Sequence, residues 1–246
     1  MTSSESEKTH IRYARLAGFM YLFTYVVPIT GMIITGRLEA PGEFAETAHR
    51  IMGAELLYRF GLSCQLITSV CCIILAMGLY MTVEPINSSL ALFALLFRLA
   101  ESTIGCASGI LSFTVLNLYL GAHSANAFNA TQLSVFMDLF TVARSIEFNV
   151  AMVLLGIGSI LFFYLFLKSS YIPKVLSAWS LFASALFTVV SLTFLLLPQY
   201  SKLLQLGWLP MGVAEITVGL WLLLKGVNLG TQGSGVKNSV AAQSFQ

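Results

Sequence analysis

The sequence predicts an all-α fold: a polytopic transmembrane helical bundle of six spans, with an extra outer amphipathic helix between spans one and two. Hydrophobic residues form 57% of the chain and charged residues only 10%, whereas charged residues make up about 25% of an ordinary soluble domain. Six segments also reach the roughly 20 apolar residues that a helix needs to cross a bilayer. They cover approximately residues 16–36, 57–82, 89–120, 134–167, 175–197 and 208–227.

The spans are expected to form one six-helix transmembrane domain over residues 14–228, flanked by two tails. Residues 1–13 and 229–246 are polar and poor in aromatic residues, a composition typical of flexible segments. The Lys and Arg residues near the span ends predict the orientation. Seven fall on the side that holds both termini and four on the other side, which places both tails in the cytoplasm. The seven are Lys8, Arg12, Arg15, Lys168, Lys174, Lys225 and Lys237, against Arg37, Arg50, Arg59 and Lys202.

Several elements differ from a plain membrane crossing. Pro28 falls inside span one and predicts a kink or an unwound turn. After span one, Phe44, Ala48, Ile51 and Met52 recur at helical spacing, which predicts the amphipathic helix. Spans three and four exceed 30 residues, roughly 48 Å of helix against a hydrocarbon core of about 30 Å, so they must tilt, bend or project. Small residues that let helices pack closely occupy 105–109 and 156–159.

Two spans each carry an arginine and a glutamate three residues apart. These are Arg98 and Glu101 in span three, and Arg144 and Glu147 in span four. A spacing of three puts both side chains on one helix face, so each pair is expected to interact. An ionisable residue at bilayer depth costs roughly 2.5–3.5 kcal/mol on insertion scales and marks a candidate functional site. Counted at about 1.5 Å per residue, the first pair is expected near mid-membrane and the second near the outer interface.

Further polar residues extend these pairs into a predicted funnel that opens to the outside and narrows to Arg98 and Glu101. Buried Arg–Glu pairs also bridge helices, so a structural role stays open beside ligand binding and direct catalysis. Seven charged residues exceed what one helix-locking pair requires, which favours a ligand site. The candidate ligand-binding or cavity residues are Arg98, Glu101, Glu215, Glu55, Arg59, Asn117, Arg144 and Glu147.

Motifs of specific enzyme chemistries are absent from the sequence. It contains no GxSxG or HExxH motif and no His-rich span, which disfavours an enzyme. If the protein is an enzyme, Glu101 and Glu215 are the two carboxylates that would serve as its general acid and base. The four cysteines lie in apolar runs without CxxC spacing, and the three histidines fall on separate tails or loops, so neither a metal nor a cofactor is expected. A net charge of +2 without a basic cluster gives no indication of a nucleic-acid partner.

Four blocks of the sequence are distinctive. They are the Pro41-Gly42 start of the outer helix with Glu55-x-x-x-Arg59, the FR-x-x-E of span three, the SSYIPK turn, and the closing E-x(5)-W-x(3)-KG. On these blocks, and over about residues 14–228, the chain resembles the bacterial DUF4386 family of uncharacterised integral membrane proteins. The resemblance implies a multi-pass protein of the bacterial plasma (inner) membrane and assigns no catalytic residue.

The leading hypothesis is an integral membrane protein that binds, or moves, a small polar or amphipathic ligand in an outward-facing polar cavity. Transporters built from inverted repeats break corresponding helices in both halves, but span four has no proline to match Pro28, which weakens transport. The alternatives are a membrane-embedded enzyme acting on a lipid or isoprenoid, and a structural or scaffold protein. Membrane lipids and a small-molecule ligand are the expected partners.

Overall fold

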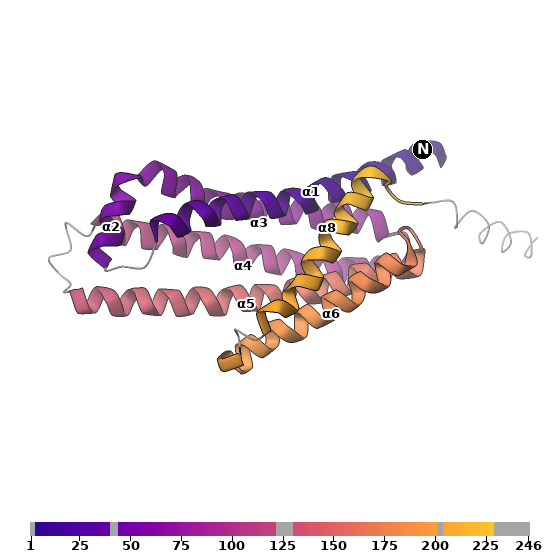
Figure 1. Ribbon diagram of the computed structural model, residues 1–246. Coiled ribbons are helices and arrows are strands. Elements are labelled where there is room, and N and C mark those ends of the chain that lie inside the picture. The colour runs from indigo at the N-terminus through magenta and orange to yellow at the C-terminus, as the bar shows by residue number, and fades with distance from the viewer. Residues whose placement is uncertain (1–2, 40–43, 122–129, 201–203, 229–246) are drawn as a thin grey trace, which may run out of the picture.

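The computed structural model describes residues 3–39, 44–121, 130–200 and 204–228, and within these ranges the chain is helical and has no β-strand. Six helices are long and apolar enough to cross a membrane, and a shorter helix lies between the first two (Figure 1). The predicted architecture is therefore confirmed, and the chain is a multi-pass membrane protein. The elements are α1 (Ser3–Leu38), α2 (Phe44–Gly53), α3 (Glu55–Val83), α4 (Ser88–Leu120), α5 (Ala130–Ser169), α6 (Lys174–Leu196), the 3₁₀ turns η2 (Pro198–Tyr200) and η3 (Gln205–Trp208), and α8 (Leu209–Leu224).

Helix α1 begins earlier than the predicted first span. It begins at Ser3, so most of the segment over residues 1–13 that was expected to be a flexible tail is helix. The helix is continuous through Pro28, although the proline removes one backbone amide from the hydrogen-bond ladder. The hydroxyl of the neighbouring Thr24 donates to the carbonyl of Tyr21 at 2.9 Å. The C-terminal tail predicted over 229–246 lies outside the described residues.

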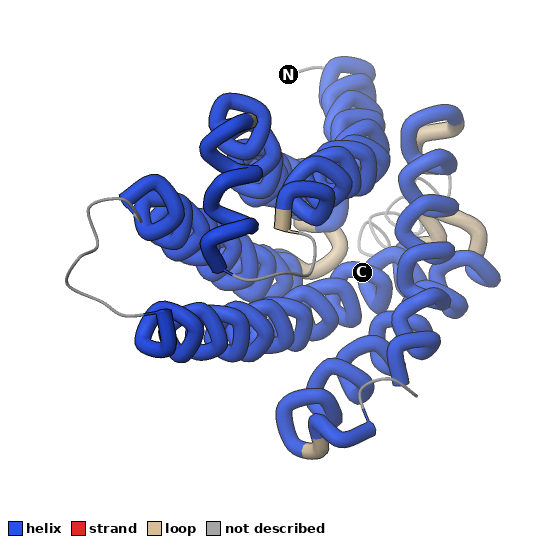
Figure 2. The backbone as a smooth tube through the Cα atoms, turned by 60° about the vertical axis from the view of Figure 1, so that its left-hand side comes forward, coloured by secondary structure: helices blue, strands red, loops and turns tan. Residues whose placement is uncertain are grey.

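The long helices pack side by side in an order that brings the first and last spans together. Helix α1 contacts α3 and α8, α4 lies between α3 and α5, and α5 packs against α6. Figure 1 shows α8 crossing the bundle at an angle, with its C-terminal end near the start of α1. Figure 2 shows the same bundle from a second direction, with short loops joining the described helices.

The amphipathic helix α2 covers the opposite end of the bundle, where α3, α4 and α5 project past α6 (Figure 1). Its buried residues Ala48 and Ile51 belong to one apolar cluster with Tyr58 of α3 and Leu116 of α4. The length of α4 and α5, at 33 and 40 residues, lets both helices extend past α6 to the end of the bundle that α2 covers.

Glycines allow the closest helix approaches. A Cβ added to Gly18 of α1 would lie 2.4 Å from the backbone nitrogen of Leu223 in α8. A Cβ on Gly158 of α5 would lie 3.0 Å from Cγ of Arg98 in α4. The small residues predicted over 156–159 therefore pack against neighbouring helices as expected, and Gly158 makes room for the arginine side chain.

Candidate functional site

Arg98 and Glu101 occupy the interior of the bundle on one face of α4. Their relative exposures are 3% and 8%, and their nearest charged atoms, Nη1 and Oε2, are 3.6 Å apart. Arg98 lies ten residues after the start of α4 at Ser88, about 15 Å along the helix at 1.5 Å per residue. That distance is half of a hydrocarbon core of about 30 Å. The predicted pair therefore exists and is buried deep in the bundle.

The pair does not satisfy its own hydrogen-bonding atoms. Nε and Nη1 of Arg98 and Oε2 of Glu101 are buried and have no hydrogen-bond partner in the structure. A separation of 3.6 Å exceeds the 2.7–2.9 Å typical of a charged hydrogen bond. A buried polar group without a partner costs about 1–3 kcal/mol, and a charged one costs more. These three atoms therefore need a water molecule or a ligand.

Helix α8 adds a third buried charge. Glu215 is 7% exposed, and its Oε2 accepts a hydrogen bond of 2.7 Å from the hydroxyl of Tyr25 in α1. The close packing of α1 on α8 produces this contact. Gly219 lies one turn after Glu215, and a Cβ there would approach Cβ of Tyr21 to 2.8 Å. Small residues beside Glu215 thus bring both tyrosines of α1 up to its carboxylate.

Electrostatic interactions join these residues across the interior. The guanidinium of Arg98 interacts with Glu101, Glu215 and Tyr21, although no ion pair within 4.0 Å links Arg98 to Glu215 among the described residues. We refer to Arg98, Glu101, Glu215, Tyr21 and Tyr25 as the charge cluster. It draws on three helices, α1, α4 and α8, from both ends of the sequence.

The other predicted site residues lie outside the charge cluster. Glu55 and Arg59 pair with each other across one turn of α3 at 2.7 Å, with side chains about 40% exposed. Asn117 is exposed at the α2 end of α4. Arg144 and Glu147 form no ion pair within the described chain: Arg144 is exposed, while Glu147 is half-buried.

Arg144 instead lines a cavity of about 200 Å³ near α2, together with Glu39, Tyr58 and Tyr119. The hydroxyl of Tyr58 donates to Glu39 there. The residue of α4 that lines this cavity closest to Arg98 in sequence is Leu111, thirteen residues or about 20 Å further along the helix. A single funnel running from this end to Arg98 was predicted, but this cavity and the charge cluster are separate.

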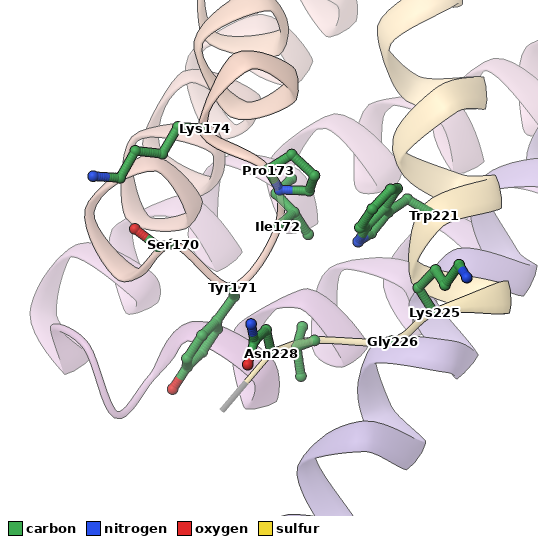
Figure 3. Close-up of a pocket in the computed structure, with 10 residues that line it drawn as sticks. Ser170, Tyr171, Ile172, Pro173, Lys174, Trp221, Lys225, Gly226 and Asn228 are labelled. Atoms are coloured by element: carbon green, nitrogen blue, oxygen red, sulfur yellow. The ribbon is translucent and has the colours of Figure 1, made fainter. Parts of the chain in front are cut away.

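A larger cavity of about 540 Å³ lies at the other end of the bundle, between the turn joining α5 to α6 and the end of α8 (Figure 3). It contains none of the predicted site residues. Its lining includes Lys174, Lys225, Trp221 and Tyr171, and burial raises the pKa of the Tyr171 phenol, so this hydroxyl stays neutral. Figure 3 shows the Lys174 amine pointing away from Trp221, so the two lysines do not converge on one position.

Sequence reasoning missed the tyrosines of the charge cluster. Tyr21 and Tyr25 are one helical turn apart in an apolar span, and a buried glutamate elsewhere in the chain requires a donor. Those two signals indicate that a buried glutamate needs a donor, but they do not identify Tyr25 as the partner of Glu215. Among the described residues, no group of three or more His, Cys, Asp or Glu side chains is arranged to hold a metal ion.

Comparison with known proteins agrees with this architecture. Residues 16–226 match the family described as Domain of unknown function (DUF4386). No curated protein and no solved structure matches the chain. The matched range contains the whole charge cluster and extends over all six spans. The chain therefore belongs to the DUF4386 family.

Proposed function

We propose that this membrane protein binds a small polar or amphipathic ligand at the charge cluster. The observation that carries the proposal is the set of unpartnered atoms on Arg98 and Glu101, two charged side chains that are more than nine-tenths buried. A ligand that supplies an acceptor to the guanidinium and a donor to the carboxylate would remove this cost. The hydroxyl of Tyr25 and the carboxylate of Glu215 give the site further polar contacts.

A purely structural role for the pair fits the geometry less well. A buried ion pair repays its desolvation only when its geometry is good and the remaining hydrogen bonds are made. Arg98 and Glu101 are too far apart for a direct hydrogen bond, and both keep open polar atoms. An ion pair that serves only to hold helices together is expected to make a direct hydrogen bond and to leave no polar atom without a partner.

A membrane-embedded enzyme is the second reading. It would use Glu101 and Glu215 as acid and base on a lipid or isoprenoid. Both carboxylates are over nine-tenths buried, which leaves less room for a lipid chain beside them than for a small ligand. Binding needs fewer assumptions than catalysis, and we place the binding role first.

Thermal unfolding in detergent with four small probes tests the proposal. The probes represent each charge class: methylammonium, acetate, glycine as a zwitterion, and acetamide as a neutral amide. A probe present at ten times its dissociation constant stabilises the folded protein by about 1.4 kcal/mol. We expect at least one probe to raise the melting temperature of the wild type and to have no effect on the Arg98→Met/Glu101→Gln/Glu215→Gln variant, which removes every charge of the charge cluster.

The matched control is the Arg59→Met/Glu55→Gln variant. It removes one arginine and one glutamate, but from a pair that is about 40% exposed and outside the charge cluster. We expect this control to respond to the probes as the wild type does. The proposal fails if no probe stabilises the wild type, or if the probe acts equally on the variant that lacks Arg98, Glu101 and the Glu215 carboxylate.

A further inference from the structure

The charge cluster contains more negative than positive charge. Arg98 contributes one positive charge, whereas Glu101 and Glu215 contribute two carboxylates, and all three residues are more than nine-tenths buried. The described lysines and the other arginines are not part of the cluster, because Arg98 is the only cation that interacts with Glu215 among the described residues. If all three groups were ionised, the cluster would carry one net negative charge in the membrane interior.

That uncompensated charge belongs to Glu215. Glu101 lies beside Arg98 at 3.6 Å, whereas Glu215 has the Tyr25 hydroxyl as its hydrogen-bond donor. A phenol supplies a hydrogen bond but no positive charge. An isolated ionised carboxylate in an apolar interior is costly enough that such a group takes up a proton or a counter-ion instead.

The helices packed around Glu215 present no second cation to its carboxylate among the described residues. The facing titratable side chains are Tyr21 and Tyr25 from α1, Cys72 from α3, and Arg98 and Glu101 from α4. Helix α6 also packs on α8, but its one charged residue is Lys174 at its first position. None of these groups balances Glu215.

We infer that Glu215 is the binding position for a small monovalent cation, which takes the place of a proton on its carboxyl group. This inference rests on the proposed function and specifies that the ligand is positively charged. A protonated amine and a sodium ion are two sources of the same charge. The open N–H groups of Arg98 do not contradict it, because they need an acceptor oxygen, which a water molecule can supply without a negative charge.

The experiment follows the melting temperature of the full-length protein in neutral detergent at pH 6 and pH 8. In the absence of a binding cation, the folded wild type holds one proton more than the unfolded chain, so its stability falls as pH rises. For one proton, the unfolding equilibrium constant rises up to tenfold per pH unit. Methylammonium chloride or sodium chloride at pH 8 should return the wild type towards its melting temperature at pH 6, relative to the same concentration of choline chloride.

The Glu215→Gln variant fixes the neutral form of the side chain. We expect it to fold, to lose the difference between pH 6 and pH 8, and to ignore both cations, while the Glu55→Gln control behaves as the wild type. The inference is overturned if the wild type melts equally at both pH values, if Glu215→Gln keeps the pH difference, or if neither cation stabilises the wild type at pH 8. Stabilisation by acetate or acetamide instead would support the proposed function and overturn the cation assignment.

Discussion

Replacing Arg98 with methionine tests the energetics of the charge cluster. The substitution keeps an unbranched apolar stem of similar length, which preserves the contact with Gly158 of α5, and removes the positive charge. Glu101 then remains more than nine-tenths buried without a counter-charge. Removing one partner of a buried pair typically costs about 3–5 kcal/mol.

Protonation of Glu101 limits that cost and gives it a pH dependence. An ordinary glutamic acid has a pKa near 4.3, so neutralising it takes about 3.7 kcal/mol at pH 7 and about 1 kcal/mol at pH 5, at 1.36 kcal/mol per pH unit. The Arg98→Met variant should therefore be less stable than the wild type by about 3–4 kcal/mol at pH 7 and by about 1 kcal/mol at pH 5. Adding Glu101→Gln removes the lone carboxylate and should restore stability to within about 1 kcal/mol.

Equilibrium unfolding in detergent at the two pH values measures these differences for the wild type, the single variant and the double variant. Arg98→Met as stable as the wild type at pH 7 would refute the reasoning. So would a loss that is equal at pH 7 and pH 5, because the cost would then come from packing rather than from a buried charge.

Four further variants separate packing, hydrogen bonding and surface charge, each read from thermal unfolding. Gly18→Ala places a Cβ 2.4 Å from a backbone nitrogen of α8, so it should destabilise by about 1–3 kcal/mol, whereas Gly36→Ala meets no atom within 4 Å and should be neutral or slightly stabilising. Tyr25→Phe removes the donor of the 2.7 Å hydrogen bond to α8 and should cost about 1–3 kcal/mol; unchanged stability would show that this bond is not formed. The Glu55→Gln/Arg59→Met change affects a pair about 40% exposed and should shift stability by less than about 1 kcal/mol.

The spans and the deep charge pair were predictable because the membrane constrains them directly. The bilayer fixes the length of an apolar helix. A charged residue inside such a helix is rare, so it indicates a candidate functional site. Arg98 and Glu101 were identified on those grounds, and the structure buries both. The mid-membrane depth expected for them rests on the rise per residue of a helix.

The contacts between distant helices were not predictable in the same way. Tyr25 meets Glu215 because Gly18 and Gly219 let α1 cross α8 closely, and no local pattern encodes that crossing. The helical start of α1 at Ser3 was missed for another reason. Polar composition suggests an unpacked tail, but a helix already nucleated in the span extends into such a segment at little cost.

An experimental density map that resolves ordered water would test the central claim most directly. The account predicts density from a water molecule or ligand within hydrogen-bonding distance of Arg98 Nε or Nη1 and of Glu101 Oε2, the atoms that the protein leaves without partners. A map in which Arg98 and Glu101 close into a direct, fully bonded pair, with no other density beside them, would contradict it.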